Sequence, residues 1–165
     1  MNINLKSQRV IIKNFTLKDI NIVYINWFNG KKTNLKFSRH YRKCYNRNFL
    51  IKNYLITKSK SIFIGIFDKK SLELIGTMIV LKQSKGLKYN VGILIGNEKY
   101  LSKGYAFESL KLFVDYVFKK TKCKFITLGT DKKNSSMIKL AKKFKIMKKL
   151  NSKHNSIVFE FRKYS

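Results

Sequence analysis

The chain has 165 residues, 44% of them hydrophobic, so it can bury the core of one domain but hardly of two. It carries 37 Lys and Arg against 8 Asp and Glu, a formal net charge of +29, and a field of this sign attracts nucleic acids, anionic membranes and acidic small molecules alike. No apolar run approaches the about 20 residues that span a bilayer, and the two distant cysteines, Cys44 and Cys123, indicate neither a disulfide framework nor a zinc site.

The N-terminal third predicts one strand and two helices. Residues 9–15 form a short apolar run that is typical of a strand. Thr16 and Asp19 have the spacing of a capping box, and apolar residues follow at helical spacing as far as Asn29. The basic segment 31–47 has no firm period and predicts a loop, and a second helix is expected over residues 48–57.

Three strands are predicted next. Apolar runs occupy residues 61–67, 74–81 and 89–95, and polar turns separate them. Because runs of this kind around short turns pair as hairpins, we expect an antiparallel meander.

The remainder alternates helices and strands. We expect a helix from Lys103 or Gly104 to Phe118, a strand over 125–128, a helix over 136–144, and strands over 146–150 and 157–161. No Gly-, Ser- or Pro-rich run is typical of a linker, so residues 1–165 are predicted to form a single domain.

The loop before the third predicted helix has the layout of an anion cradle. It joins a buried strand to a helix whose apolar positions include Leu110, Phe113 and Val117. The first N–H groups of a helix have no partner inside it, and the helix dipole is positive at that end, so a phosphate is stabilised there. Gly104 lets the backbone approach a ligand closely because it has no Cβ.

At these residues the chain resembles the GNAT superfamily of acetyl-CoA-dependent N-acyltransferases, whose pyrophosphate loop reads Gln/Arg-x-x-Gly-x-Gly/Ala. Gly104 and Ala106 match this pattern, whereas Leu101 stands where the family usually has Arg or Gln. Asn134, in the segment 131–138, resembles the start of the family's Asn-x-x-Ser-Ile sequence. The predicted order of elements is also similar to the GNAT order across nearly the whole chain.

The resemblance implies an α+β fold in a single GNAT-like domain, with a central mixed, mostly antiparallel sheet of about seven strands flanked by about four helices. It also implies acetyl-CoA as cosubstrate and no metal. Backbone N–H groups near Ile93 to Ile95 would polarise the thioester carbonyl. The residues expected to contact the cosubstrate are Ile93, Leu94, Ile95, Leu101, Ser102, Lys103, Gly104, Tyr105, Ala106, Phe107 and Asn134.

Two positions depart from the family's catalytic pattern. The carboxylate that often takes the amine proton corresponds to Asn90, which cannot act as a base, and the usual proton-donating Tyr corresponds to Ala141. Asn90 is still named as a candidate catalytic residue because it occupies this position, and His40 is a candidate replacement base, since imidazole titrates in the useful range. Glu108 is expected to face solvent, where its charge suits the helix dipole.

The acceptor implied by the resemblance is a small-molecule amine, with an amino sugar or nucleotide-linked amino sugar favoured. Its candidate ligands are Trp27, Arg39, His40 and Tyr41, because cations and a flat ring suit a nucleotide diphosphate. A solvated basic loop with anchoring aromatics explains the same residues about equally well.

Two other functions remain open. One is acetylation of a protein N-terminus, and the other is a non-catalytic nucleic-acid-binding or regulatory protein on the same fold. Nucleic acid is not favoured as a partner, because the lysines are spread along the whole chain rather than gathered in one stripe. The N-terminal residues lack the apolar core of a signal peptide, so we expect a cytoplasmic protein. The oligomeric state is left open, a homodimer included.

Overall fold

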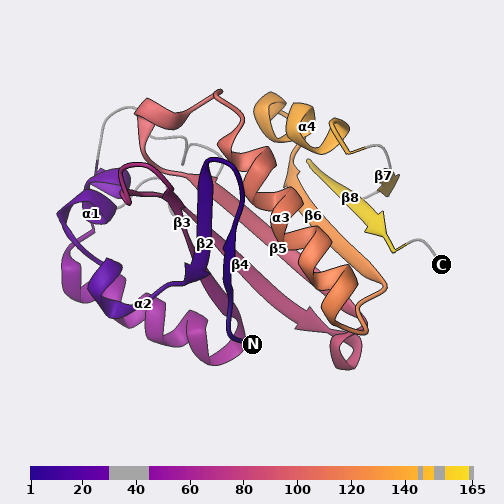
Figure 1. Cartoon of the computed structure of the whole chain (residues 1–165), viewed down its shortest axis with the longest axis horizontal. Helices are drawn as coiled ribbons and strands as arrows, with labels where there is room; N and C mark the ends of the chain where they lie inside the picture. Colours follow the sequence, from indigo (N-terminus) through magenta and orange to yellow (C-terminus); the bar gives the residue numbers. More distant parts are fainter. Residues whose placement is uncertain (30–44, 145–146, 151–154, 164–165) are drawn as a thin grey trace.

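The computed structural model describes residues 1–29, 45–144, 147–150 and 155–163, which form one eight-stranded sheet with four helices of more than one turn (Figure 1). The strands are β1 (Asn4–Lys6), β2 (Val10–Asn14), β3 (Ile62–Asp68), β4 (Leu74–Gln83), β5 (Lys88–Ile95), β6 (Phe125–Asp131), β7 (Met147–Leu150) and β8 (Ser156–Arg162). The helices are α1 (Ile22–Asn29), α2 (Arg47–Lys60), α3 (Tyr105–Lys120) and α4 (Ser135–Lys142).

The strand order in the sheet is β1-β2-β3-β4-β5-β6-β8-β7. Every pair is antiparallel except β5 with β6, which is parallel because α3 carries the chain back between them. These two strands pair only from Lys88 to Asn90 with Phe125 to Thr127, and beyond that point they diverge. A fork therefore opens in the middle of the sheet.

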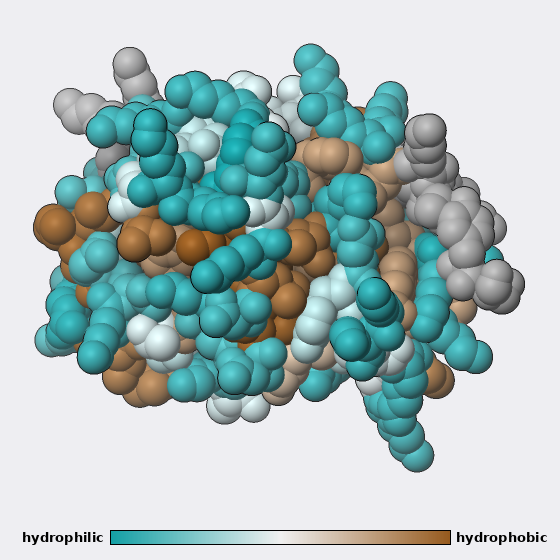
Figure 2. All heavy atoms as spheres, viewed as in Figure 1, coloured by the Kyte–Doolittle hydropathy of each residue, from teal (hydrophilic) through white to brown (hydrophobic). Residues whose placement is uncertain are grey.

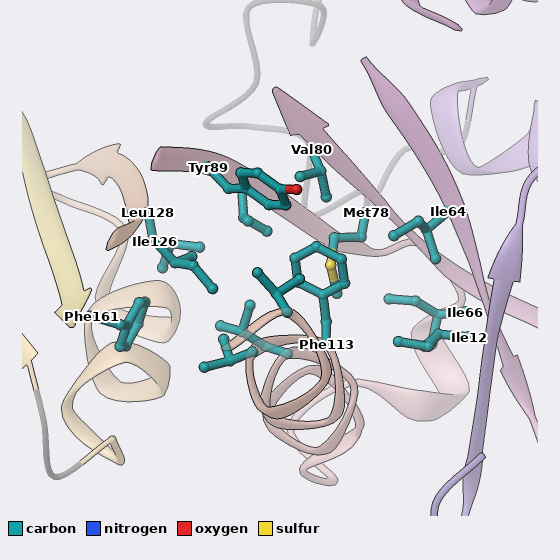
Figure 3. Close-up of a cluster of buried hydrophobic side chains, with 14 of the residues drawn as sticks. Ile12, Ile64, Ile66, Met78, Val80, Tyr89, Phe113, Ile126, Leu128 and Phe161 are labelled. Atoms are coloured by element: carbon teal, nitrogen blue, oxygen red, sulfur yellow. The ribbon is translucent and has the colours of Figure 1, made fainter. Parts of the chain in front are cut away.

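The alternation of side chains along β3 separates the two layers of the core. Ile64 and Ile66 belong to the cluster under α3, while Phe63 and Phe67 belong to the cluster under α1 and α2. In the first cluster, Phe113 of α3 is fully buried among aliphatic side chains from β2, β3 and β4 (Figure 3). The second cluster is mainly aromatic, with Phe15 in contact with the rings of Tyr24, Tyr54 and Phe63.

This arrangement confirms the predicted α+β fold, with small differences at element ends. The sequence pattern missed β1, because three residues are too few to show an alternation. The Thr16–Asp19 capping box opens a short 3-10 turn at Leu17–Asp19, and α1 itself begins at Ile22, where the Asn21 side chain accepts a hydrogen bond from the N–H of Tyr24 at 3.1 Å. The second helix runs to Lys60, three residues further than its apolar spacing predicts.

The basic surface is distributed over the molecule. Exposed lysines occur on α2, β4, α3 and α4, at Lys60, Lys82, Lys119 and Lys142. Figure 2 shows hydrophilic side chains spread over the face in view, with hydrophobic side chains between them, rather than gathered along one edge. None of the helices in the described ranges has the length and apolar content needed to cross a bilayer.

Candidate active site

The fork between β5 and β6 is closed at its base by a side-chain hydrogen bond. Asn90 and Thr127 form the last register pair, and the Asn90 Nδ2 donates to Thr127 Oγ1 at 3.1 Å. The Thr127 hydroxyl in turn donates to the carbonyl of Tyr89 at 3.4 Å. Asn90 thus has a structural role where the strands part, and a catalytic role for it stays a prediction.

A pocket of about 430 Å³ occupies the open part of the fork. Its walls come from β4, β5, β6 and the N-terminal turn of α4, and α1 and α2 close it with the rings of Tyr24, Phe28 and Tyr54. Ile93 and Leu94 line it, whereas Ile95 is buried in the core below α3, and contact of these residues with the cosubstrate stays a prediction. The pocket therefore exposes the backbone of a strand that has lost its neighbour, which is where a carbonyl can be polarised by an N–H group.

The loop before α3 has the backbone of an anion cradle. Gly104 is the N-cap with φ of 87°, and Ser102 also has a positive φ of 58°. The first bond of α3 runs from the N–H of Glu108 to the carbonyl of Gly104 at 3.0 Å. The N–H groups of Tyr105, Ala106 and Phe107 consequently have no acceptor among the described residues, so a diphosphate fits this end of the helix.

Several side chains around the start of α3 pack toward the protein, whereas Ser102 and Lys103 in the loop are exposed. Tyr105 donates its hydroxyl to Asp68 Oδ1 at 2.9 Å, and the ring of Phe107 packs on Phe144 at 5.0 Å between centroids. Leu101 and Ala106 pack against the core cluster under α3. The pKa of Asp68 is lowered, chiefly because the backbone N–H of Ser71 donates to it.

Arg9, in the turn between β1 and β2, braces the cradle. Its Nη1 donates to the carbonyl of Lys103 at 3.1 Å, and its Nη2 lies 3.3 Å from where a Cβ on Gly104 would stand. The guanidinium also lies over the ring of Tyr105, 4.7 Å from the centroid. A permanent cation is therefore present beside the cradle even though Leu101 is not basic.

Glu108 does not face solvent as the sequence suggested. Its side chain is 18% exposed and forms an ion pair with Arg9, whose Nη2 is 2.7 Å from Oε2. Ser7 Oγ and the backbone N–H of Arg9 donate to its Oε1 at 2.6 and 2.8 Å. Burial opposes its charge, but these hydrogen bonds together outweigh burial, so the pKa of Glu108 is lowered.

Asn134 is the N-cap of α4 and also lines the pocket. Its Oδ1 accepts from the N–H of Met137 at 3.2 Å, while its Nδ2 has no partner among the residues that the structure describes. The cap and a ligand contact are therefore compatible, because they use different atoms of the same amide.

Trp27 lies in the core of the structure. Its side chain is 5% exposed, packs edge-on against Tyr24, and occupies the space beside Gly96, where a Cβ would lie 2.1 Å from the indole ring. It is absent from the pocket lining, and its role in acceptor binding stays a prediction. Arg39, His40 and Tyr41 lie outside the described residues.

The described lining of the pocket also contains the ionisable side chains of Asp131 and of three tyrosines, Tyr24, Tyr45 and Tyr54. Burial raises the pKa of Tyr24 well above its ordinary value, so its hydroxyl keeps its proton as a donor. Ala141, at the family's Tyr position, is fully buried in the core. Asp131 ends β6, which runs three residues beyond the predicted strand, and the available sequence signal was a carboxylate shortly after that strand and three residues before Asn134. Among the described residues, no group of three or more His, Cys, Asp and Glu is placed to hold a metal ion.

Residues 9–146, most of the chain, match the family model of the acetyltransferase (GNAT) domain, so this protein belongs to the GNAT acetyltransferases. Enzymes of this family use acetyl-CoA as donor and bind small-molecule acceptors. Comparison with curated protein sequences finds no match.

Several solved structures share the fold. A GNAT-family acetyltransferase from Bacillus anthracis has a TM-score of 0.77 at 21% identity, with 99% of each chain covered. FdhC, a nucleotide-linked sugar GNAT, has a TM-score of 0.76 at 20% sequence identity, and the match covers 99% of this chain and 92% of the FdhC chain. The ribosomal-protein-S5-alanine acetyltransferase from Vibrio fischeri has a TM-score of 0.67 at 15% sequence identity, and the match covers 98% of this chain and 97% of that one. At these identities the likeness shows the fold alone.

Proposed function

We propose that this acetyltransferase moves the acetyl group of acetyl-CoA to a primary amine on an amino sugar or a nucleotide-linked amino sugar. The observation that carries the transfer itself is the fork between β5 and β6. It has an anion cradle at the start of α3 and a pocket between the diverging strands. A diphosphate held at the cradle allows a pantetheine chain to enter the fork, where free backbone N–H groups of β5 can polarise a thioester carbonyl.

The lining of the pocket supports a sugar as acceptor. It offers neutral amide and hydroxyl groups from Asn53, Thr57, Thr77 and Thr130, together with aromatic rings from α1 and α2. Sugar hydroxyls can exchange hydrogen bonds with such groups, and the apolar faces of a sugar ring can pack on aromatic side chains. The nucleotide-linked sugar GNAT that shares the fold adds weak support.

A turnover screen tests this proposal. Purified protein is mixed with acetyl-CoA and one amine at a time, and release of the free thiol of CoA is measured with a colorimetric thiol assay. The panel contains glucosamine, a nucleoside-diphosphate amino sugar, spermidine and peptides that begin with alanine or serine. We expect thiol release with one of the amino sugars, confirmed by mass spectrometry of an N-acetylated product.

Other results would redirect or remove the proposal. Turnover confined to the peptides would favour acetylation of a protein N-terminus instead. Salt-sensitive capture by nonspecific DNA, with no measurable affinity for acetyl-CoA, would contradict the enzymatic proposal. A cytoplasmic location and a single domain over residues 1–165 stay predictions.

A further inference from the structure

We infer that Asp131 receives the amino group of the acceptor and takes its proton during transfer, an inference that rests on the proposed function. Among the described residues that line the pocket, Asp131 is the only one with a charged side chain. The composition of the chain makes this unusual, since Lys and Arg outnumber Asp and Glu by 37 to 8. The part of the lining that the structure describes, with one carboxylate and no Lys or Arg, attracts an ammonium group.

Asp131 stands on the side of the fork that faces away from α3. Alternation along β6 places it with Thr127 and Gly129, because Ile126 and Leu128 point into the core under α3. Gly92 shares this face on β5. A Cβ added to Gly92 or Gly129 would meet nothing within 4 Å, so this face of the fork is open to a ligand.

The carboxylate of Asp131 is held by one oxygen and presents the other. Its Oδ1 accepts from the N–H of Lys133 at 2.7 Å, whereas its Oδ2 has no hydrogen-bond partner in the described part of the chain. The side chain is half-buried. It is thus oriented without being neutralised, which is what a group that must accept a proton requires.

The reaction balances with this assignment. The bound ammonium group first gives one proton to water, because only the neutral amine has a lone pair for attack. The amine nitrogen then forms a bond to the acetyl carbonyl carbon as the bond between that carbon and sulfur breaks, the electron pair leaves on sulfur, and the nitrogen is left with one proton too many. The carboxylate of Asp131 accepts the proton that the nitrogen loses, and that proton then passes to the sulfur or to water. Asn90 cannot perform this step, because an amide has no basic lone pair at neutral pH and its Nδ2 is committed to Thr127.

Asp131→Asn is the decisive variant, because the amide oxygen can still accept from Lys133 while the charge is lost. We expect its affinity for acetyl-CoA and its thermal midpoint to equal those of the wild type. With the amine found by the screen, kcat/KM should fall by about 100-fold or more. Binding of that amine to the complex with CoA, measured by calorimetry, should weaken as well. Added formate should restore part of the rate in Asp131→Gly.

The matched control is Asp115→Asn, which removes a carboxylate from the exposed face of α3, where it pairs with Lys111. Its kinetics should not change. A wild-type kcat/KM in Asp131→Asn would overturn the inference while leaving the proposed function intact. A wild-type protein that binds acetyl-CoA but no amine of the panel would overturn both the inference and the amino-sugar acceptor of the proposed function. A wild-type protein that neither binds nor turns over acetyl-CoA would overturn the proposed function itself.

Discussion

Arg9 and Glu108 are 99 residues apart in the sequence, yet their side chains join the β1–β2 turn to the first turn of α3. The Glu108 carboxylate accepts hydrogen bonds from the backbone N–H of Arg9 and from its guanidinium. The hydroxyl of Ser7 donates to the same carboxylate oxygen as the backbone N–H. The guanidinium also holds the carbonyl of Lys103. The edge of the sheet therefore fixes the loop that is expected to bind the diphosphate.

Glu108→Gln should destabilise the protein in a pH-dependent way. Because the folded pKa of Glu108 is lowered, its stabilisation is fully present above the unfolded value near 4.5 and is lost as pH falls through the folded value. At neutral pH we expect a loss of about 1–2 kcal/mol, allowing for the half-exposed Arg9. Urea unfolding at several pH values measures it. A deficit that stays constant down to strongly acidic pH would contradict this account.

Gly104→Ala should weaken acetyl-CoA binding about tenfold or more, because the new Cβ would press on Arg9 and narrow the approach to the backbone. The positive φ also makes alanine unfavourable by about 1–2 kcal/mol. Gly86→Ala separates the two effects, since Gly86 has the same φ of 87° but lies in the turn between β4 and β5. It should lose similar stability and bind acetyl-CoA as the wild type does. If Gly104→Ala and Gly86→Ala bind acetyl-CoA equally well, the assignment of the loop before α3 as the anion cradle is removed.

Asn134→Ser should keep α4 capped, because serine is as good an N-cap as asparagine, and should lose only the free Nδ2. If that group contacts the cosubstrate, calorimetry will show several-fold weaker acetyl-CoA binding with an unchanged thermal midpoint. Asn46→Ser, at the N-cap of α2, is the matched control and should change neither quantity. Full affinity in Asn134→Ser would leave Asn134 with the cap alone.

The parts of this structure that the sequence predicted are those encoded locally. Alternation defined β3, helical spacing defined α3, and Gly104 marked the start of that helix. The fork was implied only by family resemblance, because the point at which β5 and β6 separate depends on the pairing of Asn90 with Thr127, which are 37 residues apart. Long-range contacts of this kind leave no periodic trace.

The charged contacts of the site show the same limit. Arg9 belongs to a turn and Glu108 to the polar face of a helix, so each is typical of a solvated surface when its own segment is considered alone. Asp131 differs, because its position three residues before Asn134 was visible in the sequence, although the predicted strand ended at residue 128 and the observed strand ends at Asp131. What the sequence lacked was the charge of its surroundings, which the assembled pocket supplies.

Two glycines of the β5 region should respond to alanine in opposite ways. At Gly96 the added Cβ would lie 2.1 Å from the buried ring of Trp27, so Gly96→Ala should cost about 1–3 kcal/mol of stability through overpacking. At Gly92 the same methyl would meet nothing within 4 Å, and it would extend into the pocket. Gly92→Ala should therefore keep the stability of the wild type and change the KM of the acceptor, with little effect on acetyl-CoA binding. Thermal melts and steady-state kinetics on both variants make the comparison. A destabilised Gly92→Ala, or an acceptor KM that it leaves untouched, would argue against this pocket as the acceptor site.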